Sequence, residues 1–515
     1  SGVRTVLRPD RFISDPATAE SVKSRGTENV KIGFADIESR LHGHTWALGE
    51  HYSMVDAYLL VFSTVAPVSD VLSESLSEIS ARCYEIFSGV VREIVDAYRQ
   101  FRPTPPFNVL PELMGRAAPH FREVDDWDPY YHVGHLSLPP GSSYEDLLRL
   151  VSDLHEPMLD RDRLLFRCWL IDGVPGGRFA IYTKTHHSVV DGVSGLRMLY
   201  RGLASTDEPA IPEPAFALPP ADPEPPEEHA PASLLHKITD SIRTVVSQAG
   251  AVNQISMEML RKAVSAAVGG DPKGSVPFLA HHAPTNQPLK QGRSFATLSL
   301  PLEEMHQIGH RFGGTLNDVA ATIVDAGVHA YLAETGDPFP HRLVAMIPVS
   351  LRTEGDTTVG TRVTALFPRL GDPEAPVGQR IQQVVESVQT AKRDLDGWAT
   401  DTAMTYGAGL LGLAILGAQT HVDQMTPPAC NLVISNVPGI NETRYLNGAP
   451  LLGIYPISAL AASIGLNVTL SSYHDHMDFG FVANTAGIED VSALADHTLL
   501  AYRELKKAAA SAQSA

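Results

Sequence analysis

The stretch "TKTHHSVVDGVSG", residues 183–195, joins a segment of strand-like pattern to a segment of helical pattern. Apolar and polar side chains alternate through "RFAIYTKTHH", residues 178–187, which is the period of a β-strand. Apolar residues recur at three- and four-residue steps through "GVSGLRMLYRGLA", residues 192–204, which is the period of a helix. Between them lie His186 and His187, so the stretch predicts a strand, a turn with two titratable side chains, and a helix.

The two adjacent histidines are compatible with a general base, a metal site or a structural pair. The unperturbed pKa of imidazole lies near neutrality, which suits general-base chemistry. If the strand stays regular to its end, His186 and His187 point to opposite faces, and only one of them faces a cavity. A zinc site needs a third protein ligand, and the sequence has no HExxH motif and no cysteine cluster. The pattern disfavours a metal and leaves the other two interpretations open.

The Asp-Gly pair that follows the histidines is expected to shape the turn. Asp191, four residues after His187, is placed to hydrogen-bond a histidine ring or to lock the loop. Gly192 is expected to permit a close turn into the next helix. Spacing alone makes HHxxxDG a moderate signal, because a pair of histidines is more often structural than catalytic.

Composition places the chain among soluble globular proteins and excludes several function classes. Of its 515 residues, 43% are apolar and 19% are charged. The formal net charge of -19 is unsuited to nucleic acid and to permanent residence on an anionic membrane. Cys83, Cys168 and Cys430 form no CxxC pair, and the first residues contain no apolar signal segment. We therefore expect a cytoplasmic protein.

The distribution of proline divides the chain into two α/β lobes. Residues 206–232 are rich in proline and acidic residues, so they are predicted to form an extended linker. Before the linker, residues 1–101 have a mainly helical pattern and residues 102–205 mix strands and helices. After it, residues 233–515 form the second lobe, which also mixes strands and helices. Strands are expected at 130–140, 164–174, 177–187, 293–302, 341–352, 363–370, 430–439, 466–475 and 477–485, and helices at 144–157, 192–204, 302–312 and 315–335.

Several motifs together resemble one acyltransferase family. "HHSVVDG" resembles the HHxxxDG signature of the chloramphenicol acetyltransferase-like superfamily. "TLNDVAATI" (315–323), "MIPVSLR" (346–352) and "NLVISNVPG" (431–439) are similar to segments of the bacterial wax ester synthase/acyl-CoA:diacylglycerol acyltransferases. These motifs occur in the family's order, and the resemblance covers roughly residues 104 to 507. It implies two chloramphenicol acetyltransferase-like lobes.

The resemblance implies a direct acyl transfer from acyl-CoA to a long-chain alcohol or diacylglycerol. His187 would act as the general base, with His186 beside it, and no cofactor is expected because acyl-CoA is a substrate. Family members pair the Asp of the motif with an Arg, which makes Arg352 the candidate partner of Asp191. Peripheral contact with a membrane or a lipid droplet would follow from the acceptor.

Three further residues are candidate substrate contacts. Asn317 is a candidate donor to the oxyanion of the tetrahedral intermediate, although capping of the following helix is the favoured role, shared with Asp318. Ser435 and Asn436 are expected to shape a turn before Pro438, with the lining of an acceptor channel as the alternative.

The N-terminal segment has a second resemblance. "FADIESRLHGHTWALGEHYSMVDAYLLVF", residues 34–62, is similar to the C-terminal helical domain of bacterial glutathione S-transferases, over about residues 17–64. The thioredoxin-like half is absent from this sequence, so no glutathione chemistry is expected. The segment is interpreted as an appendage, and the alternative is that it replaces the missing first segment of the acyltransferase family.

Two other functions remain open from sequence. One is a different HHxxxDG acyltransferase, such as a condensation-type enzyme of peptide synthesis. The absence of a carrier or adenylation domain beside it and the "ISNVPG" segment argue against this alternative. The other is an acyl-CoA- or lipid-binding protein with weak catalysis, for which tight binding without turnover would be diagnostic.

Overall fold

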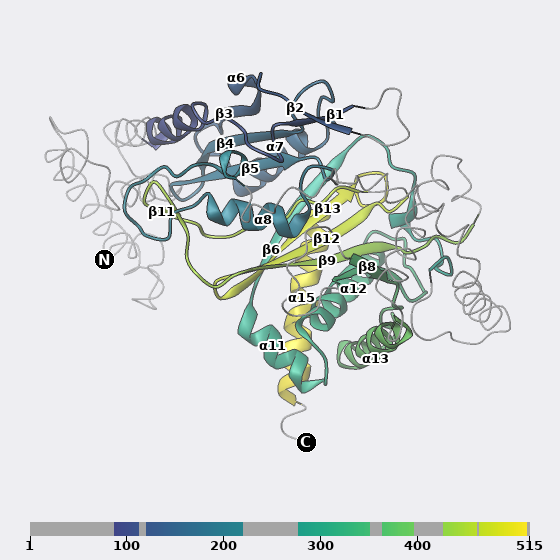
Figure 1. Ribbon diagram of the computed structural model, residues 1–515. Helices are drawn as coiled ribbons and strands as arrows, with labels where there is room; N and C mark the ends of the chain where they lie inside the picture. Colours follow the sequence, from purple (N-terminus) through teal and green to yellow (C-terminus); the bar gives the residue numbers. More distant parts are fainter. Residues whose placement is uncertain are drawn as a thin grey trace, which may run out of the picture. The chain divides into compact units, whose positions relative to one another are not determined.

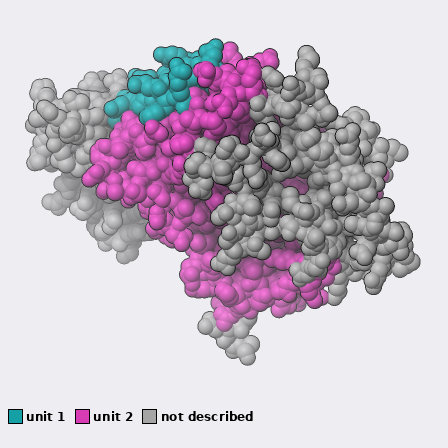
Figure 2. Space-filling model, in the orientation of Figure 1, with its two compact units in different colours: residues 1–102, 126–150, 166–185 teal, residues 103–125, 151–165, 186–515 magenta. Residues whose placement is uncertain are grey.

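The computed structural model describes residues 87–112, 120–219, 277–350, 363–395, 426–460 and 463–511. The chain divides into two compact units, coloured separately in Figure 2. Unit 1 comprises residues 1–102, 126–150 and 166–185, and unit 2 comprises residues 103–125, 151–165 and 186–515. Outside the described residues lie residues 17–64, for which a resemblance to a glutathione S-transferase was predicted, residues 220–232 of the predicted linker, and Arg352.

Unit 1 contains a three-stranded sheet in the order β3-β4-β5. The strands are β3 (Val133–Ser137), β4 (Phe166–Val174) and β5 (Arg178–Thr185). The first two are parallel and the last two antiparallel. A helix at 87–98 and the short α6 (Pro129–His132) belong to the same unit. The residues predicted as strand at 130–132 are therefore helical, because Asp128 caps Tyr130 and Tyr131 through their backbone N–H groups.

Unit 2 is built on a six-stranded sheet in the order β6-β13-β12-β9-β7-β8. Its central strands pair in parallel, β12 with β9 and β9 with β7, and its outer pairs are antiparallel. The strands are β6 (Arg293–Pro301), β7 (Ala345–Ser350), β8 (Val363–Leu366), β9 (Leu432–Ile440), β12 (Leu466–Tyr473) and β13 (His476–Asn484). Each of these six strands was predicted from the sequence.

Four helices form the core of unit 2 with one face of this sheet (Figure 1). They are α11 (Leu302–Arg311), α12 (Leu316–Glu334), α13 (Val377–Leu395) and α15 (Val491–Ser511). In β12, Leu466, Val468 and Leu470 belong to this core. Because side chains alternate along a strand, the intervening polar residues Asn467 and Thr469 point to the opposite face.

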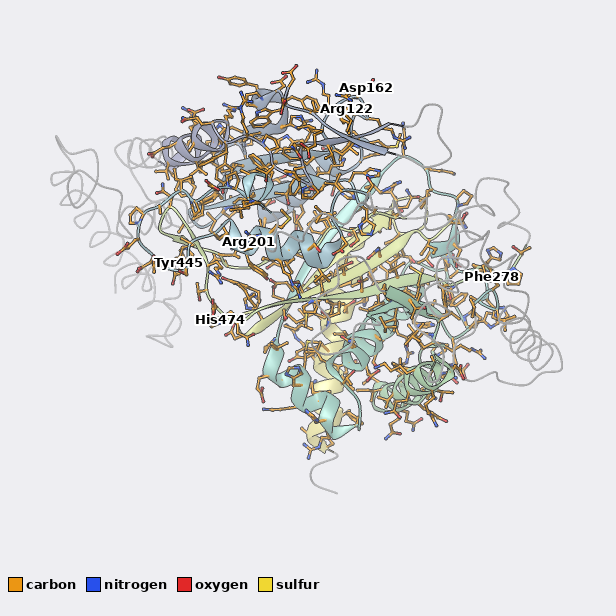
Figure 3. The ribbon with its side chains drawn as sticks, viewed as in Figure 1. Arg122, Asp162, Arg201, Phe278, Tyr445 and His474 are labelled. Carbon is orange, nitrogen blue, oxygen red and sulfur yellow. The ribbon has the colours of Figure 1, made fainter. Side chains whose placement is uncertain are left out.

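Helix α8 (Gly192–Arg201) packs on that opposite face. Leu196 and Tyr200 contact Tyr473 in a small apolar cluster, and the two tyrosine rings stack with centroids 6.3 Å apart. After α8, the backbones of Ala204 and Tyr445 pair through two hydrogen bonds of 2.8 and 2.9 Å. Figure 3 labels Arg201 at the end of α8 and Tyr445 in the paired strand. These contacts fix the helix that follows the histidine motif on the sheet of the same unit.

The remaining elements are short or lie at the edges. They are α7 (Tyr144–His155), the hairpin of β1 (Val109–Glu112) and β2 (His120–Glu123), the hairpin of β10 (Tyr445–Leu446) and β11 (Ala449–Pro450), and the 3-10 turns η2 (Ala215–Ala217) and η3 (Pro284–Asn286). In the described start of the proline-rich segment, Phe216 is buried. None of the helices in the described ranges is long and apolar enough to cross a membrane.

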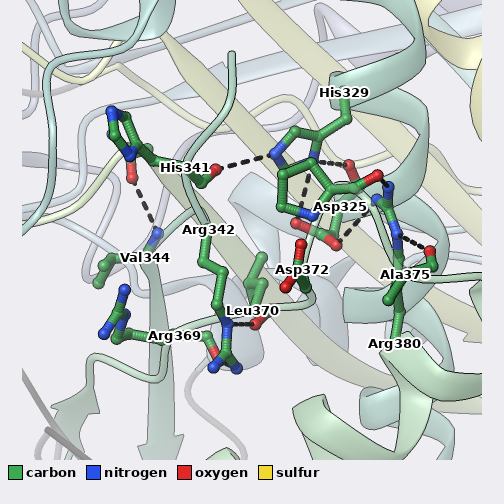
Figure 4. A network of polar contacts seen from close by, with 12 residues as sticks. Asp325, His329, His341, Arg342, Val344, Arg369, Leu370, Asp372, Ala375 and Arg380 are labelled. Atoms are coloured by element: carbon green, nitrogen blue, oxygen red, sulfur yellow. Dashed lines mark hydrogen bonds and ion pairs between the residues drawn. The ribbon is translucent and has the colours of Figure 1, made fainter. Parts of the chain in front are cut away.

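A buried charged network joins α12 to α13 (Figure 4). Asp325 is fully buried, and its Oδ2 lies 3.4 Å from Nη1 of Arg380. Both ring nitrogens of His329 face carbonyl oxygens: Nδ1 lies 2.9 Å from that of Asp325 and Nε2 lies 3.0 Å from that of His341. Carbonyls accept but never donate, so only the doubly protonated imidazolium satisfies both contacts. The Asp325 carboxylate therefore faces two cations.

The close approach of a loop to β13 makes one glycine necessary. The N–H of Ile454 donates to Oδ2 of Asp478 at 2.7 Å, which holds the loop 451–460 over the sheet. A Cβ built on Gly480 would overlap the carbonyl oxygen of Pro456 in this loop. Only glycine therefore allows the loop to approach β13 this closely.

Gly480→Ala should lower the free energy of unfolding by about 1–3 kcal/mol, the usual cost of forcing backbone apart in a packed region. Gly89→Ala is the matched control, because nothing lies within 4 Å of a Cβ at that helical position. It should raise stability by up to about 1 kcal/mol through helix propensity. Urea unfolding of the two variants measures this difference. Equal stability of the two variants would contradict the packing argument.

Candidate active site

The histidine motif forms a tight turn at the start of the third segment of unit 2, residues 186–515. Strand β5 ends at Thr185, and the N–H of His186 donates to the carbonyl of Leu165 at 2.9 Å. The N–H of Val189 then donates to the carbonyl of His186 at 2.9 Å, which closes the turn. The prediction that strand alternation continues through His187 was wrong, because this turn ends the strand before either histidine. Alternation therefore does not decide which ring is catalytic.

The ring of His186 is held within the turn. Its Nδ1 lies 2.7 Å from Oγ of Ser188 and accepts the backbone N–H of Ser188 at 3.2 Å. Partial burial, followed by the charges of Arg161 and His187, lowers the pKa of His186 below its ordinary value. Both histidines are exposed, and the turn engages the ring of His186 through the hydroxyl and the backbone N–H of Ser188.

Asp191 begins α8. It is the N-cap residue, and its Oδ1 accepts the N–H of Ser194 at 2.8 Å. This cap stabilises the helix whose first residue follows the histidine turn. Asp191 therefore locks the loop, one of the two roles expected for it. Its pairing with Arg352 stays a prediction, because Arg352 lies outside the described residues.

Gly192 does not need the conformational freedom expected of it. It is the first helical residue and is absent from the positive-φ glycines of the described chain. A Cβ at this position would lie 3.6 Å from Cγ2 of Val437, an ordinary van der Waals contact. The prediction of a close turn that requires glycine was therefore wrong. The contact does show that the motif lies beside β9.

An amide pair joins β9 to the first turn of α12. Nδ2 of Asn436 donates to Oδ1 of Asn317 at 2.7 Å. The preference for Asn317 as a helix cap was wrong. Thr315 is the N-cap residue, and Asp318, the other residue expected to cap, is the N3 partner of the capping box, since its Oδ2 accepts the N–H and the hydroxyl of Thr315, each at 2.7 Å. Asn317 is exposed and free of that task.

Ser435 and Asn436 point to opposite faces of β9. Asn436 shares the face of Ile434, which belongs to the core beneath the four helices. Ser435 shares the face of Val437, which packs with α8, and it pairs in register with Thr469. Both residues lie within strand β9, so the predicted turn before Pro438 is not formed. The structure thus brings Asn436 to Asn317 and directs Ser435 away from that pair.

Sequence reasoning missed two contributors to this arrangement. No role was predicted for Ser188, although a hydroxyl two residues after a histidine in a turn is within reach of its Nδ1. The Asn317–Asn436 bond spans 119 residues, and nothing local signals it. Among the described residues, no group of three histidine, cysteine, aspartate or glutamate side chains is placed to hold a metal.

Comparison with known proteins assigns this fold and motif to one family. The model of the wax ester synthase/diacylglycerol acyltransferase catalytic domain matches residues 55–320, and that of the family's C-terminal domain matches residues 359–506. The match begins at residue 55, well before residue 104, where the recognisable motifs start. It therefore includes residues 55–64, the end of the segment for which a resemblance to a glutathione S-transferase was predicted.

Individual relatives agree with the family models. A putative diacylglycerol O-acyltransferase of Mycobacterium tuberculosis is 32% identical over 424 residues, 82% of this chain and 92% of the relative. The O-acyltransferase WSD of Acinetobacter baylyi is 31% identical over 403 residues, 77% and 84% of the two chains. The solved wax ester synthase/diacylglycerol acyltransferase of Marinobacter aquaeolei is 26% identical, with a TM-score of 0.64 and coverage of 82% and 90%. The chain therefore belongs to the wax ester synthase/diacylglycerol acyltransferase family of O-acyltransferases.

Proposed function

We propose that the chain transfers a long-chain acyl group from acyl-CoA to the hydroxyl of a fatty alcohol or of diacylglycerol, with His187 as the general base. The observation that carries the proposal is the HHxxxDG turn itself. In it both histidines are exposed, the ring of His186 is bonded to Ser188, and Asp191 caps the following helix. Family membership supports the reaction class, and the HHxxxDG turn supports His187 as the general base.

The proposed reaction is a direct displacement at the thioester. His187 takes the proton of the acceptor hydroxyl as its oxygen attacks the acyl carbonyl. The tetrahedral intermediate collapses with cleavage of the C–S bond, and the imidazolium returns the proton to the departing thiolate. Ester and free CoA are the products, and the base is regenerated without a covalent enzyme intermediate.

Asn317 is proposed as a donor to the oxyanion of that intermediate. Its Oδ1 is occupied by Asn436, which turns the amide group and leaves Nδ2 as a donor at the exposed start of α12. The N-terminus of a 19-residue helix also favours negative charge near it. An oriented amide next to developing negative charge is the arrangement of an oxyanion hole.

Asn317→Ala should lower kcat by about 10²-fold, the cost of one oxyanion donor. Asn436→Leu should lower kcat less, because it removes only the orienting bond. Gln307→Ala removes an exposed amide of the neighbouring helix α11 and serves as the control. Steady-state CoA release measures all three. A loss in Asn317→Ala no larger than in Gln307→Ala would remove Asn317 from the mechanism.

The function is tested by product analysis with two acceptors side by side. The purified chain is incubated with a long-chain acyl-CoA and either hexadecanol or diacylglycerol, and the lipids are resolved. Wax ester, triacylglycerol or both should form in step with CoA release. Tight binding of acyl-CoA without ester formation would favour the lipid-binding alternative. Ester formation only with a carrier-bound amine or hydroxyl would favour the condensation-type alternative.

Contact with a lipid surface is part of the proposal. Both acceptors partition into lipid, so the chain is expected to meet them peripherally at a membrane or a lipid inclusion from the cytoplasm. Flotation with phosphatidylcholine vesicles that contain diacylglycerol, compared with vesicles that lack it, tests this contact. Sedimentation of the chain away from both kinds of vesicle would contradict it.

A further inference from the structure

The contacts of His186 fix the protonation state of its ring. The backbone N–H of Ser188 points at Nδ1 over 3.2 Å, and a backbone N–H can only donate. Nδ1 must therefore offer its lone pair, and the proton of the neutral ring must reside on Nε2. The hydroxyl of Ser188, 2.7 Å from the same nitrogen, donates to it as well. A proton on Nδ1 would oppose the N–H of Ser188.

The same contacts close the turn that presents His187. The His186 backbone bonds Leu165 on one side and Val189 on the other, and its ring bonds Ser188. The backbone on both sides of His187 is thus fixed by groups of His186 and Ser188. A general base must be held within a few tenths of an ångström of its working position, and a misplacement of about 1 Å can cost 10²-fold in rate.

The charge of His186 also matters to the chemistry. His187 becomes a cation when it accepts the proton of the attacking hydroxyl, and a second cation on the adjacent residue would oppose this step. The groups that face His186 are Arg161, from the loop before β4, His187 and Ser188. Partial burial, followed by the charge of Arg161 and the neighbouring ring of His187, lowers the pKa of His186 below its ordinary value.

We propose that His186 is a positioning residue, which acts through Nδ1 held by Ser188 to fix the turn that presents His187 and to keep the neighbouring ring neutral. The proposal rests on the proposed function, because His187 is the base whose position is at issue. It assigns a task to Ser188, a position that the motif itself leaves open.

Two amide substitutions distinguish Nδ1 from Nε2. Oδ1 of asparagine replaces Nδ1 as an acceptor for the N–H of Ser188, whereas the amide of glutamine reaches the position of Nε2. His186→Asn should retain most of kcat, and His186→Gln should lose on the order of 10²-fold. Ser188→Ala, which keeps the backbone donor, should lose up to about tenfold, the value of one ordinary hydrogen bond. Better activity in His186→Gln than in His186→Asn would overturn the proposal.

The pH dependence of kcat gives a readout that a merely structural role would not move. Because a proton on His186 opposes the cation that forms on His187 during turnover, log kcat of the wild type should fall more steeply at low pH than log kcat of His186→Asn. In His186→Asn the slope should stay at about one. A wild-type slope of one throughout would show that the proton on His186 has no effect on turnover.

A measurement without turnover separates this proposal from the proposed function. The ¹⁵N spectrum of histidine-labelled protein, assigned by comparison with His186→Asn, reports which ring nitrogen of His186 carries the proton. The Nε2–H tautomer is expected at neutral pH, and the Nδ1–H tautomer would refute the proposal. If the tautomer is as expected and no ester forms in any assay, the proposed function fails and the geometry of the turn stands.

Discussion

His187→Ala should lose acyl transfer by about 10³-fold while the protein remains folded, because general-base catalysis contributes roughly 10²–10⁴-fold to rate. His187 is exposed, and the turn is held by hydrogen bonds of His186, Ser188 and Leu165. Removing its imidazole therefore removes the proton acceptor without disturbing the backbone. The effect should fall on kcat rather than on KM, since the ring acts in the transition state.

CoA release at saturating acyl-CoA and acceptor measures this loss, and circular dichroism and the urea midpoint check the fold. His306→Ala, which removes an exposed histidine of α11, is the matched control and should retain activity. Undiminished CoA release in His187→Ala would disprove the role of His187. A loss of activity together with a lowered urea midpoint would show instead that the ring is structural.

Asp325→Ala should lower the free energy of unfolding by about 3–5 kcal/mol, the usual cost of breaking a buried ion pair by removing one partner. Asp325 is fully buried and faces both Arg380 and the imidazolium of His329 (Figure 4). Without its carboxylate, two buried cations face each other with nothing to balance them. Urea unfolding measures the loss, and Asp337→Ala, an exposed aspartate after the same helix, is the control. A loss of unfolding free energy in Asp325→Ala no larger than that in Asp337→Ala would contradict a stabilising role of the Asp325 network.

The same network predicts the sign of a pH effect on stability. Burial alone lowers the pKa of His329, but the hydrogen bond and charge of Asp325 and the carbonyl of His341 outweigh it, so the pKa lies above the ordinary value of 6.5. A raised folded-state pKa means that this stabilisation is complete below pH 6.5 and is lost as the pH rises through the folded-state value. The wild type should therefore lose stability above pH 6.5 relative to His329→Gln. If the free energies of unfolding of the two proteins change in parallel with pH, His329 is not a buried imidazolium.

The pattern of side chains was sufficient to predict the six strands of the main sheet of unit 2 and the helices α8, α11 and α12, and to single out the histidine motif. Helices α13 and α15 were not predicted. Strand β12, for example, alternates Leu466, Val468 and Leu470 with polar residues, and the core and the opposite face follow that alternation. The prediction of His187 as the general base came from the motif and its family resemblance. At the start of α12, Asn317 and Asp318 were both predicted to cap, and only Asp318 does, because the two are equivalent by propensity and only their contacts separate them.

What the sequence did not reveal depends on contacts between distant segments. The end of β5 is set by the turn from His186 to Val189, and a periodic pattern continues through that turn without a break. Asn436 finds Asn317 across 119 residues, and Gly480 is required by the loop at Pro456 rather than by its own strand. In each case several residues are equivalent by local sequence, and contacts between distant segments determine which of them takes the role.

The central claim is that the acceptor attacks acyl-CoA directly, with His187 as the base and no acyl-enzyme. The most direct test mixes the purified chain with a long-chain acyl-CoA in a stopped-flow assay of thiol release, with and without hexadecanol. If transfer is direct, one ester should form for each CoA released when hexadecanol is present, and no CoA should be released when hexadecanol is absent. A burst of one CoA per enzyme molecule without acceptor, the mark of a covalent intermediate, would contradict it.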